Sequence, residues 1–203
     1  MAAGSQISDD QLLERSRQGD AAAFAEIYRR QHRAVFHFTV HMTGSPGLAE
    51  EVTQEVFMAL MRDSGKYDPT RGVLQAYLLG MARKFVLRIL KRERAYLGMA
   101  EDAEENAAAE SRETWAAAPD NLINGLAREE TIRKVRQTVL ALPAHYREVT
   151  VLCDLQELSY NEAAAVLGLA AGTVRSRLHR ARAMLLERLL PLREAAASTL
   201  GQD

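Results

Sequence analysis

The 203-residue chain contains a single cysteine and no long apolar segment. With Cys153 alone, it cannot form an internal disulfide bond, which makes a cytoplasmic location the default expectation. No run approaches the roughly 18 apolar residues that a membrane-spanning helix needs. The first residues have neither an early basic cluster nor an apolar core, so we predict no secretory signal peptide.

Signals for strands, cofactors and metals are also missing. Val, Ile and Thr never gather in an alternating pattern, so the sequence predicts no β-strand, and no glycine-rich phosphate-binding loop is present. His37 and His41 lie one helical turn apart, as metal ligands often do, but no HExxH glutamate and no third ligand accompany them. We therefore predict no metal site, no cofactor and no enzymatic activity, and we interpret Cys153 as a buried thiol.

The total charge of −1 conceals an uneven distribution along the chain. The net charge is +3 over residues 1–97, −6 over 98–125, +4 over 126–193 and −2 over 194–203. Two basic segments therefore flank an acidic one. This pattern indicates two modules able to meet a polyanion, joined by a segment that would avoid one or imitate one.

Helix start signals recur through both basic segments. Two S-x-x-[QE] capping boxes begin at Ser8 and Ser159. Ser45-Pro46 marks another start, because proline is pre-shaped for the first turn of a helix. A further helix is expected from about Val73 to Leu97, after the loop KYDPTRG. Most of both segments is thus predicted to be helical.

The overall prediction is an all-α protein of two small helical domains joined by an acidic flexible linker. Residues 98–125 are rich in Ala and acidic residues and have few large apolar groups, so packing alone cannot offset the entropy of ordering them. The predicted organisation is a first domain over 1–97, the linker over 98–125, a second domain over 126–193 and a tail over 194–203.

The second domain contains a helix, a short glycine turn and a helix, which is typical of helix-turn-helix proteins. Its last helix is expected to begin near Ala171 and to end at about Leu190, just before Pro191. Apolar residues recur along this helix at spacings of four, three and four from Val174, and they predict its buried face. A solvent-facing side is left for polar residues.

That solvent-facing side is strongly basic. It carries donors suited to phosphates and guanine edges: Arg175, Ser176, Arg177, His179 and Arg180. No acidic residue lies between Glu162 and Glu187, so these arginines have no ion-pair partner on their own helix. The pattern favours DNA contact over an ordinary solvated helix face.

These features resemble extracytoplasmic-function (ECF) sigma factors of bacteria. The stretch LPAHYREVTVLCDLQELSYNEAAAVLGLAAGTVRSRLHRARAMLLERL is similar to their region 4, and GDAAAFAEIYRRQ followed by AEEVTQEVF is similar to their region 2. The resemblance covers about residues 8–97 and 126–190. It implies an alternative-type sigma factor that binds core RNA polymerase and directs promoter-specific transcription initiation, with an anti-sigma factor as a further partner.

The resemblance also implies a role for each group of residues. Region 4 would read the minus-35 element as duplex DNA and sit on the beta-subunit flap, using the solvent-facing side named above for DNA. The helix after Ser45 would bind the beta-prime clamp helices through an outer stripe of Glu51, Gln54, Glu55 and Met58. The minus-10 element would be opened and held by Lys66, Tyr67, Arg71, Lys84, Arg88 and Lys91. Tyr67 could help to capture a flipped base by stacking, although a loop tyrosine is more often a packing residue.

The sequence departs from the family pattern at two positions near the minus-10 residues. Tyr77 stands where the family usually has tryptophan, and Lys84 stands where it has an asparagine associated with minus-10 reading. A lysine attracts phosphates without reading a base edge. The departures therefore imply an altered minus-10 preference, with more phosphate attraction and less base readout.

Two other functions are compatible with parts of the sequence. A free-standing helix-turn-helix regulator would bind duplex operators alone, but it would leave the KYDPTRG loop, the Gln54 helix and the Lys84 stripe unexplained. A helical adaptor that binds only protein is opposed by the unpaired arginines. The acidic linker is interpreted either as a nucleic-acid mimic inside the polymerase or as a solvated spacer.

Overall fold

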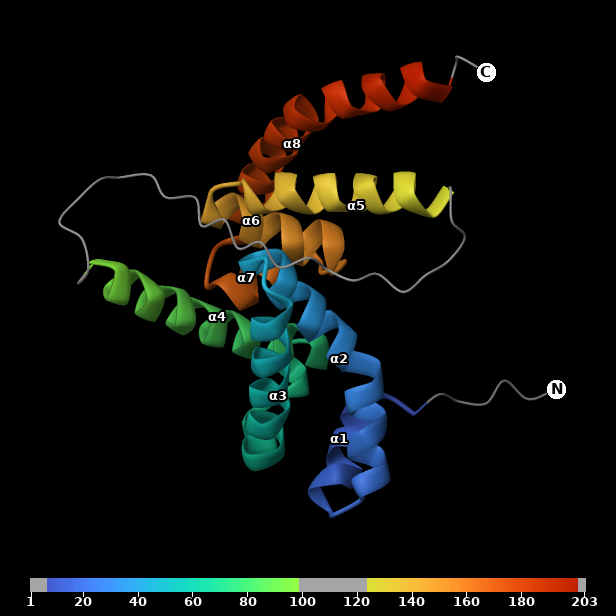
Figure 1. Cartoon of the computed structure of the whole chain (residues 1–203). Coiled ribbons are helices and arrows are strands. Elements are labelled where there is room, and N and C mark those ends of the chain that lie inside the picture. The colour runs from blue at the N-terminus through green and yellow to red at the C-terminus, as the bar shows by residue number, and fades with distance from the viewer. Residues whose placement is uncertain (1–6, 99–123, 201–203) are drawn as a thin grey trace. The chain divides into compact units, whose positions relative to one another are not determined.

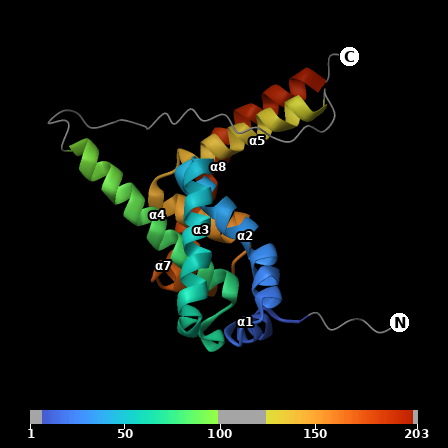
Figure 2. The same cartoon turned by 60° about the horizontal axis from the view of Figure 1, so that its bottom comes forward.

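A computed structural model describes the backbone of residues 7–98 and 124–200, and the side chains of residues 7–92 and 132–190. Every regular element in these residues is helical, which confirms the all-α prediction (Figures 1 and 2). The helices form two compact units, the first holding α1 to α4 apart from the last residues of α2, and the second holding α5 to α8. The predicted linker lies outside the described residues, except at its two ends.

The first unit follows the predicted helix starts closely. Its elements are α1 (Asp9–Arg17), α2 (Ala21–Thr43), α3 (Pro46–Asp63), the 3-10 turns η1 (Ser64–Lys66) and η2 (Pro69–Arg71), and α4 (Leu74–Gly98). The Ser8 hydroxyl accepts a hydrogen bond from the Gln11 amide at 3.2 Å, and the Gln11 side chain accepts one from the Ser8 amide at 3.1 Å. The capping box is therefore confirmed, and the predicted loop between α3 and α4 contains two short 3-10 turns.

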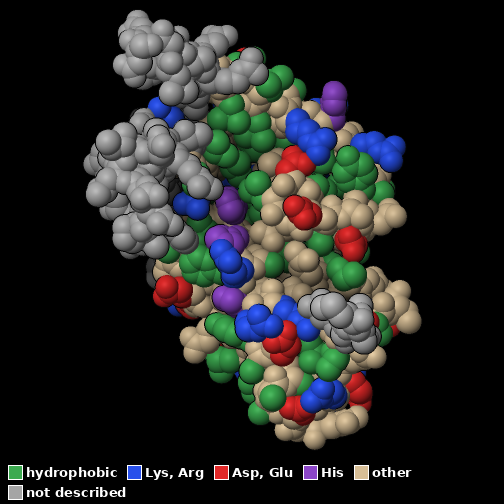
Figure 3. All heavy atoms as spheres, turned by 90° about the vertical axis from the view of Figure 1, so that its right-hand side faces the viewer, with side chains coloured by type: hydrophobic (Ala, Val, Ile, Leu, Met, Phe, Trp, Pro, Cys, Tyr) green, Lys and Arg blue, Asp and Glu red, His purple; other side chains and the backbone are tan. Residues whose placement is uncertain are grey.

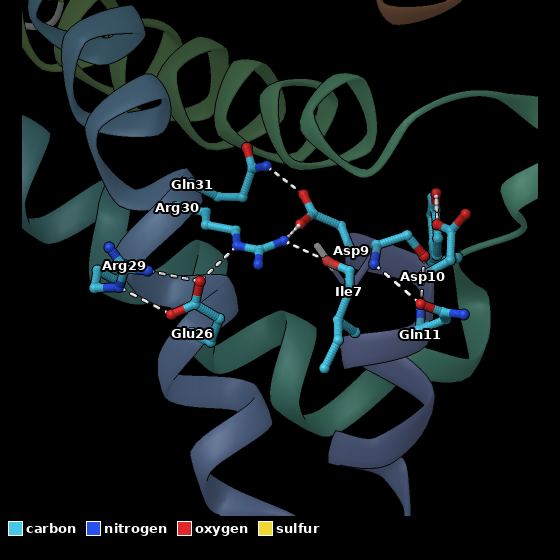
Figure 4. Close-up of polar contacts among 10 residues, drawn as sticks. Ile7, Asp9, Asp10, Gln11, Glu26, Arg29, Arg30 and Gln31 are labelled. Atoms are coloured by element: carbon cyan, nitrogen blue, oxygen red, sulfur yellow. Dashed lines mark hydrogen bonds and ion pairs between the residues drawn. The ribbon is translucent and has the colours of Figure 1, made fainter. Parts of the chain in front are cut away.

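Polar side chains fasten α1 to α2 (Figure 4). Asp9 accepts hydrogen bonds from Arg30 at 2.9 Å and from Gln31 at 2.6 Å. Arg30 also donates to Glu26 at 2.6 Å and to the Ile7 carbonyl at 2.8 Å. These pairings raise the pKa of Arg30, chiefly through Glu26. Leu12 and Leu13 are buried on α1, so the short helix is held by both apolar and polar contacts.

The packing of α3 on α4 forms much of the core of the first unit. Val52, Val56 and Leu60 are buried along α3, as their spacing predicts. From α4, the buried side chains are Leu74, Ala76, Leu78, Leu79, Ala82 and Val86. Because one face of each helix is fixed in this way, the opposite faces are left for contacts with other molecules.

The second unit is built around α8. Its elements are α5 (Asn124–Leu140), α6 (Ala144–Thr150), the π-helical turn η3 (Val151–Leu155), α7 (Tyr160–Leu167) and α8 (Ala171–Leu200). The capping box at α7 is confirmed, since the Ser159 hydroxyl accepts from the Glu162 amide at 3.3 Å and Glu162 accepts from the Ser159 amide at 2.8 Å. Gly168 then ends α7 with a left-handed φ of 68°.

The exposed fractions of the side chains identify the inner face of α8. Val174 is 0%, Leu178 1% and Ala181 0% exposed. This face contacts α6 and α7. The guanidinium of Arg147 caps the end of α5 by donating to the Leu140 carbonyl and, at 3.1 Å, to the Leu142 carbonyl.

The predicted end of α8 at Leu190 is wrong, because the helix continues through Pro191 to Leu200. A proline inside a helix removes one backbone hydrogen bond and is normally unfavourable. Here it is flanked by leucine, arginine, glutamate and alanine, which are all good helix formers. The segment predicted as a tail, residues 194–203, is therefore helical as far as Leu200.

Replacing Leu178 should destabilise the second unit strongly. Leu178→Ala leaves a cavity beneath α8 and should lower the free energy of unfolding by about 2–5 kcal/mol. Leu186→Ala on the same helix is the matched control: its side chain is 60% exposed, so the change should stay within about 0.5 kcal/mol. Urea denaturation followed by circular dichroism measures both, and equal effects would contradict the assigned inner face.

Candidate nucleic-acid and polymerase interface

The outer face of α8 presents basic groups that are not committed to the fold. Arg175, Ser176, His179 and Arg180 are exposed and Arg177 is half-buried. Among the residues whose side chains are described, no carboxylate pairs with Arg175, Arg177 or Arg180. Arg175 lies over the ring of Tyr160, with its guanidinium carbon 5.7 Å from the ring centre. The predicted minus-35 residues therefore share one accessible face.

Arg182 differs from these arginines because it forms an ion pair within the protein. Its Nη2 lies 2.5 Å from Asp154 Oδ1 and its Nε lies 3.1 Å from Asp154 Oδ2, which makes a two-point ion pair. This contact raises the pKa of Arg182. Asp154 belongs to η3, 28 residues earlier in the chain. Sequence reasoning could not identify this partner, because it considered only acidic residues three or four positions away on the same helix.

The loop between α3 and α4 places its predicted DNA residues in different environments. Lys66 and Arg71 are exposed, although Lys66 Nζ pairs with Asp63 at 2.8 Å, which raises the pKa of Lys66. Tyr67 is only 6% exposed. Its ring leans on Tyr77, with ring centres 5.4 Å apart. Of the two interpretations of Tyr67, this burial favours the packing residue over the base-stacking one, because the core covers its ring.

A basic stripe runs along α4. Lys84, Arg88 and Lys91 are exposed at spacings of four and three residues. The Arg88 guanidinium carbon lies 4.8 Å from the centre of the Phe85 ring, which leaves its N–H groups free to meet an anion. None of the three forms an ion pair within residues 7–92. Such a stripe suits the phosphates of a single strand.

The outer stripe of α3 is accessible, as predicted. Glu51, Gln54 and Met58 are exposed and Glu55 is half-buried, with Met58 45% exposed. Beside this stripe lies a groove between α3 and α4. Its lining combines two acidic residues, two arginines and an apolar floor: Glu51, Val52, Glu55, Phe85, Arg88, Ile89 and Arg92. An exposed methionine among polar groups is typical of a surface that binds another protein.

Oppositely charged side chains elsewhere tend to be neighbours. Figure 3 shows one face of the molecule, on which basic and acidic side chains lie next to one another in several places. Ion pairs of the first unit include Arg15 with Asp20 at 2.6 Å and Arg29 with Glu26 at 2.7 Å. The arginines near the start of α8, like the basic stripe of α4, form no such ion pair among the described residues, which distinguishes these two groups from the paired charges of the first unit.

Comparison with known proteins identifies both units. Residues 27–96 match the family model "Sigma-70 region 2", and residues 132–185 match "Sigma-70, region 4". The ECF sigma factor SigE of Mycolicibacterium smegmatis is 29% identical over 84% of this chain and 64% of its own length. SigW of Bacillus subtilis, also an ECF sigma factor, is 29% identical over 89% of this chain and 96% of its own length.

The chain belongs to the ECF sigma factors. A solved structure of CnrH in complex with the cytosolic domain of CnrY shares this fold, with a TM-score of 0.66 and 27% identity over 90% of this chain and 97% of that one. A second structure, RpoE of Bartonella quintana with the anti-sigma factor NepR, has a TM-score of 0.63 and 24% identity over 82% of this chain and 96% of that one. This sigma factor is therefore a transcription initiation factor of the alternative type.

The remaining features considered from the sequence are metal ligands, membrane spans and the single cysteine. Within the described residues, no group of three or more His, Cys, Asp or Glu side chains could hold a metal ion. No helix in the described part of this sigma factor is long and apolar enough to cross a membrane. Cys153 is half-buried in η3, and burial raises the pKa of its thiol to about 11. A thiol of that pKa is almost wholly protonated at neutral pH and makes a poor nucleophile.

Cys153 should therefore react slowly with iodoacetamide at pH 8. Fewer thiolates form when the pKa rises from 9.0 to about 11, and the partly compensating gain in nucleophilicity leaves alkylation about tenfold slower than for a free cysteine. The same protein in guanidinium chloride is the control and should react at the ordinary rate. Mass spectrometry over time measures both rates, and equal rates would show that the thiol is not protected.

Proposed function

We propose that this sigma factor contacts its promoter and its polymerase through the surfaces described above. The outer face of α8 would read the minus-35 element, the α3–α4 loop and the α4 stripe would hold the minus-10 element, and the outer stripe of α3 would bind the beta-prime clamp helices. The observation that carries the proposal is the group of unpaired arginines at the start of α8. They lie on a helix whose opposite face is fully buried, so their position is fixed before DNA arrives.

The chemistry of the α8 face fits a major groove. An arginine can donate two hydrogen bonds to the O6 and N7 of one guanine, or one or more to a phosphate. Arg175, Arg177 and Arg180 supply such groups, while Ser176 and His179 offer shorter polar side chains between them. Ser176 already donates to the Thr173 carbonyl at 3.0 Å, which leaves its oxygen as an acceptor for DNA amino groups.

The first unit would act on the opened strand. Lys84, Arg88 and Lys91 would follow the phosphates, and Lys66 and Arg71 would meet DNA at the rim of the loop. Lys84 occupies a position where the family has an asparagine, so phosphate attraction would outweigh base readout there. Tyr67 is excluded from stacking in this conformation by its burial and would act by supporting the loop.

Polymerase and a regulator would use protein surfaces. Glu51, Gln54, Glu55 and Met58 would form the contact with the beta-prime clamp helices, and the second unit would sit on the beta flap. We further propose an anti-sigma factor as a partner, in line with the resemblance and with RpoE of Bartonella quintana, which was solved in complex with the anti-sigma factor NepR. These roles place the protein in the cytoplasm and require binding alone, without an enzymatic reaction. The domain limits 1–97 and 126–193 stay predictions.

The function can be tested with purified components. The protein is mixed with bacterial core RNA polymerase, separated by gel filtration, and the complex is assayed for transcription from a pool of genomic fragments. Co-elution with initiation at sequence-selected sites is expected. Tight binding of duplex DNA by the free protein, without co-elution, would instead indicate a free-standing helix-turn-helix regulator.

Removing one of the unpaired arginines should weaken minus-35 recognition. Arg180→Ala should reduce minus-35-dependent transcription by about fivefold or more, because a base or phosphate contact of arginine contributes about 1–3 kcal/mol. Arg188→Ala is the matched control, since Arg188 lies about two turns further along α8 and donates to the Ala141 carbonyl at 3.0 Å. Equal loss in both variants would indicate a general charge effect.

Shortening Met58 should weaken polymerase binding. Met58→Ala removes an exposed apolar side chain from the α3 stripe and should raise the dissociation constant for core polymerase by about fivefold or more. Leu87→Ala is the control, because Leu87 is 40% exposed in the same unit but belongs to α4 and lies outside the α3 stripe. Fluorescence anisotropy with labelled protein measures both constants, and a larger effect at Leu87 would move the interface from α3 to α4.

A further inference from the structure

The loop between α3 and α4 is held by a helix from the start of the chain. The Tyr67 hydroxyl lies 2.7 Å from Asp10 Oδ1, to which it donates a hydrogen bond, and 3.1 Å from the Gly72 carbonyl. Arg17 Nη2 donates to the Ser64 carbonyl and lies 3.4 Å from the Tyr67 carbonyl. Asp10 is separated from Tyr67 by 57 residues in sequence, so α1 and the loop meet only in the folded unit.

The two α1 residues are placed to act together. Asp10 and Arg17 are seven residues apart, which is about two helical turns and puts them on one side of α1. Asp10 holds the side chain of Tyr67, and Arg17 holds the backbone that precedes it. Because both attachments involve a charged group, each is stronger than a hydrogen bond between neutral partners. Tyr67 is thus held at its hydroxyl by Asp10 and at its main chain by Arg17.

The support itself is anchored. Asp9, next to Asp10, is bound by Arg30 and Gln31 of α2 (Figure 4), and Leu12 and Leu13 are buried beneath α1. Movement of α1 would therefore break contacts with α2 as well as with the loop. The loop is therefore connected through α1 to α2.

The loop also closes on itself around Tyr67. Asp68 Oδ1 accepts from the Thr70 amide at 2.9 Å and from the Thr70 hydroxyl at 2.7 Å, which lowers the pKa of Asp68. Gly72 has a φ of 146°, a conformation that favours glycine, and its carbonyl faces the Tyr67 hydroxyl. With Tyr67 inside, Lys66 and Arg71 are left exposed on either side of it.

We propose that α1 is a positioning element for minus-10 recognition, in which Asp10 and Arg17 hold Tyr67 and thereby fix the loop that carries Lys66 and Arg71. The inference rests on the proposed role of this loop in DNA binding. Ordering the loop before DNA arrives removes part of the entropic cost of binding and restricts which bases fit. Asp10 and Arg17 lie outside the matched region 2 segment, residues 27–96, so the match does not assign them this role.

Three variants and one control test the inference. Tyr67→Phe keeps the ring but removes the hydroxyl, Asp10→Ala removes the acceptor, and Asp10→Asn keeps an acceptor oxygen at the same place. Tyr28→Phe makes the same chemical change as Tyr67→Phe on an exposed tyrosine of α2. Thermal unfolding of each variant establishes that it folds. Two readouts follow: hydrogen exchange of loop amides in the free protein, and transcription by the polymerase complex from promoters altered at single minus-10 positions.

The two readouts distinguish a failure of this inference from a failure of the proposed function on which it rests. Tyr67→Phe and Asp10→Ala should speed exchange of amides 64–72 by about tenfold and reduce minus-10 discrimination by about fivefold, with polymerase affinity unchanged. Asp10→Asn should restore much of both, and Tyr28→Phe should match the unaltered protein. Unchanged loop exchange would overturn the inference, as would faster exchange with unchanged discrimination. Failure of the unaltered protein to initiate transcription would instead overturn the proposed function.

Discussion

Burial of one face of α8 is the constraint on which the DNA-binding surface depends. Val174, Leu178 and Ala181 are shielded from water against α6 and α7, and these contacts set the rotation of the helix about its axis. Turning α8 by one residue would expose this face and force an arginine into the core, where an unpaired charge is very costly. The capping box at Ser159 and the left-handed turn at Gly168 determine where α7 begins and ends, and so where α8 can start.

The same principle operates in the first unit with a different result. The buried sides of α3 and α4 pack on each other, and two exposed stripes of opposite character remain on the outside. The α3 stripe combines carboxylates, an amide and Met58, which suits a protein partner. The α4 stripe is basic and suits a nucleic acid. In the proposed roles, α3 would meet polymerase and α4 would meet DNA without any change in the buried core of the first unit.

Local signals in the sequence were sufficient for the helices and for the direction of most side chains. The capping boxes at Ser8 and Ser159 are confirmed, and so is the inner face of α8 from Val174 to Ala181, whereas Leu185 is only half-buried. Each of these predictions depends on residues within one or two helical turns. The end of α8 could not be predicted in this way, since the penalty of Pro191 competes with good helix formers on both sides. Partners distant in sequence were also invisible, as with Asp154 for Arg182 and Asp10 for Tyr67.

Side chains of the same type differ in whether they have a partner within the protein. Those that have one support the fold, and those that have none are available to bind another molecule. Arg180 and Arg182 are two residues apart on α8 and both are exposed, yet Arg182 pairs with Asp154 while no carboxylate among the described side chains pairs with Arg180. Tyr67 shows the same distinction inside the loop, where burial and then the hydrogen bond to Asp10 raise the pKa of its hydroxyl. The direction of this shift agrees with a hydroxyl that donates to a carboxylate, because both burial and that carboxylate disfavour the charged phenolate. A residue committed to such a bond cannot leave it for DNA without freeing the loop. In the proposed function, contact with the promoter would therefore fall to the exposed groups that these attachments hold in place.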